Sequence, residues 1–172
     1  MTNLSNFTPL SIAILTVSDS RVEATDKSGN LLKKKLESSG HILADKKICK
    51  DNIYAIRAIV SEWIVTSQLD VILTTGGTGV TGRDGTPEAV RPLFDKTLDG
   101  FGEMFRVLSY DEIKTSTLQS RAIAGVANAT YVFALPGSPG ACRLAWDSLI
   151  EHQLNSTTKP CNLVELMPRL LE

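Results

Sequence analysis

Short apolar runs alternate with amphipathic stretches along the chain, and this alternation predicts strands separated by helices. Apolar, β-branched runs at 11–17, 70–75 and 130–135 predict strands that are covered on both faces of a sheet. A weaker strand is expected at 41–49. The clearest helix begins after Asn52, a plausible N-cap, because isoleucine, valine and tryptophan then recur at helical spacing.

Other segments complete the alternation. Helices are expected over 26–39, from Thr86 onward with its hydroxyl as cap, over 100–113, 117–127 and 142–154, and a short final strand over 162–166. Helical crossovers between strands are right-handed, which predicts an α/β fold: a three-layer α/β/α sandwich with a mostly parallel, Rossmann-like sheet. Since no repeat or linker interrupts the pattern, we expect one domain over 1–172, with a core at about 11–166 and an N-terminal extension at 1–9.

Composition narrows the classes of function. With 18 basic and 19 acidic residues the net charge is −1, which argues against a nucleic-acid partner held by a general basic field. No apolar run approaches the roughly 20 residues needed to span a bilayer, so no membrane partner is expected. Three widely spaced cysteines without a C-x-x-C pair disfavour a disulfide framework or a zinc site. These features together predict a cytoplasmic protein.

The segment 75–85 follows a predicted strand and contains five glycines within ten residues. It lacks the early helix and the later acidic residue of a dinucleotide motif, and Arg83 and Asp84 stand where a P-loop has Lys and Ser or Thr. The segment still has the feature that these motifs share, a run of glycine-rich backbone after a strand, so the N–H groups at Thr75 to Gly79 can approach phosphate oxygens closely. The alternative is that the glycines only form a turn.

Two acids and a second loop accompany this segment. A carboxylate beside a phosphate cradle suits Mg²⁺, so Asp84, and Asp51 after the second strand, are candidate magnesium ligands. Asp51 has the alternative role of a turn residue beside the Asn52 cap. In the second loop, 136–140, Gly137 and Ser138 can donate hydrogen bonds to an anion, and Ser116 and Arg121 are candidates for the same pocket. Asp19 and Arg21 could equally form a surface pair.

Five segments together resemble the MoaB/Mog family of molybdopterin-binding proteins in molybdenum cofactor biosynthesis. They are TTGGTG at 74–79, RDGTPEA at 83–89, GFGEMFR at 100–106, STLQSRAIAG at 116–125 and LPGSPGA at 135–141. The resemblance implies a domain that binds molybdopterin, a pterin dithiolene with a terminal phosphate, and assembles into a homo-oligomer, a trimer or hexamer. For the adenylylating relatives it also implies that AMP passes from Mg-ATP to that phosphate, with release of pyrophosphate.

The resemblance assigns roles residue by residue. Asp51 and Asp84 would be catalytic, magnesium-linked carboxylates. Phosphate and nucleotide binding would fall to Thr75, Gly76, Gly77, Thr78, Gly79, Thr86 and Glu88, and pterin binding to Ser116, Arg121, Pro136, Gly137 and Ser138. Gly85 and Ser138 depart from the family, which often has a β-branched residue and, in gephyrin-like members, Asn there.

Two functions follow from this assignment. The first is an adenylyltransferase with Mg²⁺, ATP and molybdopterin as cofactor and substrates. The alternative is a catalytically silent molybdopterin-binding or carrier oligomer in the same pathway. Other molybdenum-cofactor enzymes are possible partners, and the segment 101–110 is a candidate interface between subunits. Three points stay open: whether three or six subunits assemble, whether the metal is molybdenum or tungsten, and which protein is the downstream partner.

Overall fold

The computed structural model describes residues 7–66 and 68–172, so residues 1–6 of the predicted extension lie outside the described residues. Six strands form one sheet in the order β2-β1-β3-β6-β5-β4. The strands are β1 (Ser11–Val17), β2 (Ile42–Cys49), β3 (Val71–Thr75), β4 (Lys96–Thr97), β5 (Ile123–Ala127) and β6 (Thr130–Leu135). β1, β2, β3 and β6 are mutually parallel, whereas β5 runs antiparallel to β6 and to β4.

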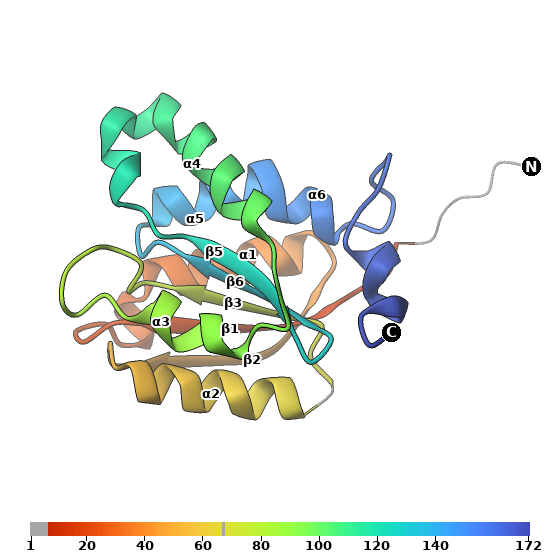
Figure 1. Cartoon of the computed structure of the whole chain (residues 1–172), viewed down its shortest axis with the longest axis horizontal. Coiled ribbons are helices and arrows are strands. Elements are labelled where there is room, and N and C mark those ends of the chain that lie inside the picture. Colours follow the sequence, from red (N-terminus) through yellow and green to blue (C-terminus); the bar gives the residue numbers. More distant parts are fainter. Residues whose placement is uncertain (1–6, 67) are drawn as a thin grey trace, which may run out of the picture.

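Helices cover both faces of this sheet (Figure 1). The α-helices are α1 (Lys27–Ser38), α2 (Ile53–Val65), α3 (Thr86–Val90), α4 (Asp99–Ile113), α5 (Pro139–Ala145) and α6 (Glu151–Leu154). The short helices are η1 (Glu23–Thr25), η2 (Arg91–Leu93), η3 (Lys114–Gln119), the π-helical η4 (Trp146–Ile150) and η5 (Val164–Arg169). Among the described residues, none of these helices has the length and apolar character needed to cross a membrane.

Two hydrophobic cores separate the three layers, and β1 shows why. Because successive side chains of a strand point to opposite faces, Ile12 and Ile14 pack with Leu32 of α1 in one core. Ala13 and Leu15 of the same strand pack with α2 in the other core, where Trp63 is almost fully buried. This arrangement confirms the predicted three-layer α/β/α fold with a mostly parallel sheet.

Three element predictions were wrong. The predicted helix at 117–127 is a 3-10 turn followed by the strand β5, because these residues hydrogen-bond with β6 across the two-residue turn at Asn128 and Ala129. The predicted strand at 162–166 is the helical turn η5. The hydroxyl of Thr86 does not cap α3: Gly85 occupies the cap position, and Thr86 hydrogen-bonds elsewhere.

Candidate functional site

A polar hollow of about 420 Å³ lies at the carboxyl ends of the parallel strands β1 and β3. Open parallel sheets place ligands at this edge. The residues that line it are Thr16, Val17, Ser18, Asp19, Arg21, Asp51, Thr75, Gly76, Gly77, Thr78, Gly79, Asp84, Gln119, Ser120, Pro136 and Gly137. Both loops and both acids singled out in the sequence therefore open into one hollow.

The glycine-rich loop bends sharply at Gly76 and Gly77, whose φ angles are +105° and +66°. A Cβ on Gly76 would lie 2.2 Å from the carbonyl oxygen of Val17, and one on Gly77 would lie 2.4 Å from Thr86 Oγ1. Thr86 fixes the bend, since its hydroxyl donates to the Gly76 carbonyl at 2.8 Å and its N–H donates to the Gly77 carbonyl at 3.0 Å. The chain can approach a bound anion here because side chains are absent.

Alanine substitutions test this bend. Gly76→Ala is expected to lower the free energy of unfolding by roughly 1–3 kcal/mol, because alanine disfavours positive φ and its Cβ collides with backbone. Gly82→Ala in the same loop is the matched control, since no atom lies within 4 Å of its Cβ position. Urea denaturation of both variants measures the difference. Equal stability of the two variants would contradict the described bend.

Three carboxylates face the hollow: Asp84 from the glycine-rich loop, Asp51 after β2 and Asp19 after β1. Asp84 accepts hydrogen bonds from the N–H and the hydroxyl of Thr81 at 2.9 and 2.6 Å, and these bonds lower its pKa. The position of a Cβ on Gly79 would lie 2.7 Å from Asp84 Oδ2, and that on Gly77 would lie 3.1 Å from both oxygens of Asp51. The two acids thus border the glycine-rich loop directly.

The number of carboxylates at this place suits a magnesium ion. Mg²⁺ commonly takes one or two carboxylates from the protein and its other ligands from substrate phosphates and water. Among the described residues, no group of three or more His, Cys, Asp or Glu side chains could hold a metal alone. Asp51 and Asp84 therefore suit an ion that arrives with a phosphate substrate better than a permanently bound one.

The pKa of Asp51 is raised, first by burial and then by the negative charges of Asp84 and Asp19. A carboxyl whose folded pKa exceeds its unfolded value of about 3.9 destabilises the fold at neutral pH. We therefore expect Asp51→Asn to unfold at a higher temperature than the wild type at pH 7.5. This gain should fade as the pH falls through the raised pKa, and thermal scans across that range measure it. A stabilisation independent of pH would contradict this charge repulsion.

The second loop is joined to the first. Thr75 Oγ1 donates to the Pro136 carbonyl at 2.9 Å, and a Cβ on Gly137 would lie 3.3 Å from the Cα of Gly76. Ser28 of α1 donates to the Gly137 carbonyl at 2.8 Å. Ser138 caps α5 by accepting from the Ala141 N–H at 3.2 Å, and it lies outside the lining of the hollow.

Four other predicted site residues also lie outside the lining. Thr86 supports the glycine-rich loop from behind, and Ser116 is exposed on η3. Arg121 donates to the Gly79 carbonyl at 2.6 Å and to the Asp84 carbonyl at 2.7 Å, and it forms an ion pair with Glu88. Arg121 thus clamps the glycine-rich loop rather than projecting into the hollow. Their predicted ligand contacts stay predictions.

Sequence reasoning did not select seven lining residues as site residues: Thr16, Val17, Ser18, Asp19, Arg21, Gln119 and Ser120. Ser18 and Arg21 follow β1, and their position after a central strand was the available signal. Gln119 and Ser120 carried no signal, because the segment around them was assigned to a helix. Asp19 pairs with Arg83 and accepts the Asp51 N–H at 3.2 Å, so it belongs to the site and not to a surface pair with Arg21.

Known proteins are similar to this chain in sequence and in fold. A family model described as a probable molybdopterin binding domain matches residues 13–156. Molybdenum cofactor biosynthesis protein B of Escherichia coli strain K12 is 56% identical over 158 residues, which are 92% of this chain and 93% of that protein. The same-named protein of Bacillus subtilis strain 168 is 48% identical over 142 residues, 82% of this chain and 84% of that one.

Solved structures agree with these relatives. A crystal structure of molybdenum cofactor biosynthesis protein B superposes with a TM-score of 0.83 at 46% identity, covering 86% of this chain and 92% of that one. The tungsten cofactor synthesizing protein MoaB from Pyrococcus furiosus gives a TM-score of 0.75 at 37% identity over 84% of this chain and 92% of that one. The chain therefore belongs to the MoaB/Mog family of molybdopterin-binding proteins in molybdenum cofactor biosynthesis.

Proposed function

We propose that the protein binds molybdopterin and transfers AMP from Mg-ATP to its terminal phosphate, releasing pyrophosphate. One observation carries the proposal: the glycine-rich loop, the second loop and the acids Asp51 and Asp84 open into one hollow. Family membership supports the pterin as one guest. The acids beside the glycine-rich loop support a second, magnesium-bound phosphate guest.

The reaction requires positioning more than a reactive side chain. An oxygen of the pterin phosphate forms a bond to the α-phosphorus of ATP, while the bond from that phosphorus to the bridging oxygen breaks and pyrophosphate leaves. Magnesium would neutralise charge on the phosphates. The N–H groups of Gly77 to Gly79 would hold phosphate oxygens, because the Gly76 N–H already donates to the Leu135 carbonyl at 3.0 Å and Thr75 is paired within the sheet. Asp51 and Asp84 would hold the ion, and Pro136 and Gly137 would border the pterin. Fixed donors and restricted orientation would supply the rate.

A single incubation tests the proposal. Protein mixed with molybdopterin and Mg-ATP should yield adenylylated molybdopterin and an equal amount of pyrophosphate, measured by chromatography. Binding of molybdopterin with no product would contradict the transfer and support the alternative, a silent carrier with the same hollow. Failure to bind molybdopterin would contradict both functions.

Assembly into a trimer or hexamer is a further part of the proposal. Within 101–110, the α4 side chains Met104, Val107 and Tyr110 are large, apolar or aromatic, and exposed. Burying them between subunits would remove this surface from water. We expect light scattering at micromolar protein to give the mass of three or six chains of 18.7 kDa. A monomer mass for the wild type would contradict the assembly. The variant Val107→Glu should have a lower mass than the wild-type assembly, closer to that of a monomer.

A further inference from the structure

The negative charge of the side chains that line the hollow opposes the binding of a phosphate substrate. Asp19, Asp51 and Asp84 contribute three carboxylates, and of the described lining residues only Arg21 is a lysine or arginine. Magnesium can offset part of this charge, and backbone N–H groups carry only partial charges. Among the described lining residues, Arg21 is therefore the one cationic side chain that can pair with a doubly charged phosphate ester.

Arg21 is free to serve as that partner. Its Nη1 donates to the Thr25 carbonyl at 2.9 Å, which leaves other guanidinium N–H groups available. Among the described residues it forms no ion pair, whereas Arg83 and Arg121 near the hollow are paired with Asp19 and Glu88. An arginine fork suits phosphate because two N–H groups can donate in parallel to two oxygens.

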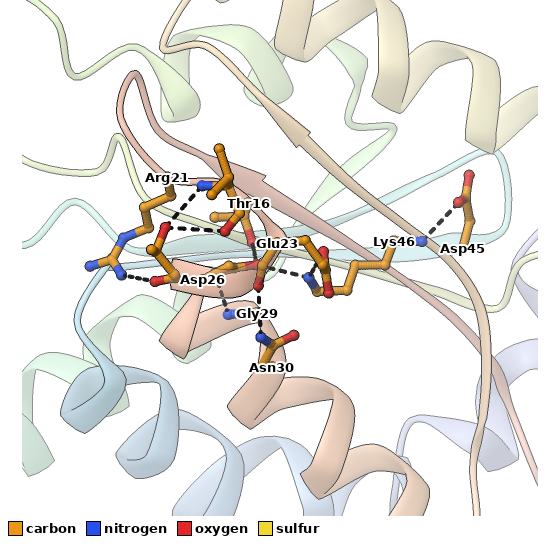
Figure 2. A network of polar contacts seen from close by, with 10 residues as sticks. Thr16, Arg21, Glu23, Asp26, Gly29, Asn30, Asp45 and Lys46 are labelled. Carbon is orange, nitrogen blue, oxygen red and sulfur yellow. Dashed lines mark hydrogen bonds and ion pairs between the residues drawn. The ribbon is translucent and has the colours of Figure 1, made fainter.

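A network of polar contacts around the buried Asp26 fixes the segment that holds Arg21 (Figure 2). Asp26, which is fully buried, follows Thr25 directly and accepts from Thr16 Oγ1 at 2.8 Å and from the Gly29 N–H at 2.9 Å. The ammonium Nζ of Lys46, on β2, lies 3.0 Å from Asp26 Oδ2 and 2.6 Å from Glu23 Oε2 of η1. The network ties η1 to β1 and β2, so the Thr25 carbonyl presents the Arg21 side chain in a set direction.

Arg21 shares the hollow with both loops. It lines the hollow together with Thr75 to Gly79 of the glycine-rich loop and with Pro136 and Gly137 of the second loop. A phosphate seated at either loop therefore lies in the same hollow as the guanidinium.

We propose that Arg21 binds a phosphate group of the substrate in this hollow, held in place by the Asp26–Lys46 network. The inference rests on the proposed function and adds to it the residue that recognises the phosphate. The phosphate has two sources, the terminal phosphate of molybdopterin and the phosphates of ATP, and the oxygens offered to Arg21 have the same chemistry in each.

Calorimetric titrations with pyrophosphate, Mg-ATP and molybdopterin test the inference on the wild type, Arg21→Gln, Arg21→Lys and Arg143→Gln. Arg143 is exposed and outside the lining, so its variant controls for loss of one positive charge. Arg21→Gln should bind pyrophosphate about 10- to 100-fold more weakly than the wild type, because it loses a charge-assisted hydrogen bond. Arg21→Lys should lose less affinity, and Arg143→Gln should bind with the affinity of the wild type. All variants should unfold at the wild-type temperature.

The titrations with Mg-ATP and molybdopterin identify which substrate supplies the phosphate that Arg21 binds. A loss with Mg-ATP alone assigns Arg21 to the nucleotide, and a loss with molybdopterin alone assigns it to the terminal phosphate. Wild-type affinity of Arg21→Gln for all three ligands would overturn the inference and leave the proposed function standing. Arg21-dependent binding of pyrophosphate without any adenylylated product would support the inference while the proposed transfer fails.

Discussion

Asp84→Asn is expected to lower the rate of molybdopterin adenylylation by at least about 100-fold, because it removes one of the two carboxylates proposed to hold magnesium. The turn should survive, since the amide oxygen can still accept the hydrogen bonds from Thr81. Molybdopterin binding should therefore change little. Release of pyrophosphate gives the rate, and pterin fluorescence quenching gives the affinity.

The control for this substitution is Asp111→Asn, which removes an exposed carboxylate of α4 outside the hollow. It should retain the wild-type rate. A wild-type rate in Asp84→Asn would contradict the proposed role of the acid. An equal loss of pterin binding would show instead that Asp84 shapes the pterin end of the hollow.

Lys46→Met is expected to lower the free energy of unfolding by about 3–5 kcal/mol, because it leaves the buried Asp26 carboxylate without its cation. In a chain of this length that loss lowers the unfolding temperature by roughly 6–20 °C. Burial raises the pKa of Asp26, but hydrogen bonds from Gly29, Lys46 and Thr16 outweigh it, so the pKa lies below its usual value. The wild type should therefore lose this stability only as the pH falls below about 4, through the lowered pKa.

Lys47→Met on the same strand is the matched control. Lys47 pairs with Asp45 and Glu62 in solvent, and exposed pairs contribute little to stability. Its unfolding temperature should stay near that of the wild type. The double variant Asp26→Asn, Lys46→Met should recover part of the loss, because no buried charge then remains unpaired. Equal effects of the two single lysine variants would contradict the account of the network.

The parallel part of the sheet was predictable because its strands are buried on both faces. Continuous apolar runs mark β1, β3 and β6, and the ends of β3 and β6 place the glycine-rich loop and the second loop at the edge where Asp51 follows β2. β5 was missed because its residues, Ile123–Ala127, are rich in alanine, which favours helices. The signal in the sequence was Asn128, a residue type that two-residue hairpin turns favour; in the structure Asn128 and Ala129 adopt the positive φ of 47° and 63° that such a turn requires.

The remaining site features depend on contacts between distant segments. Arg83 meets Asp19 across 64 positions of sequence, and Arg121 clamps Gly79 across 42. Local periodicity contains no information on such pairs. For the same reason the sequence indicated Arg121 as a pocket residue on chemical type alone, whereas its guanidinium is engaged by backbone carbonyls. Arg21, which does line the hollow, stayed open as half of a surface pair.

A crystal structure of the protein soaked with ATP and magnesium tests the central claim most directly. The account predicts phosphate oxygens on the backbone N–H groups of Gly77 to Gly79, with a magnesium ion bound by Asp51 and Asp84. A nucleotide bound elsewhere, or one whose phosphates avoid the glycine-rich loop, would contradict it.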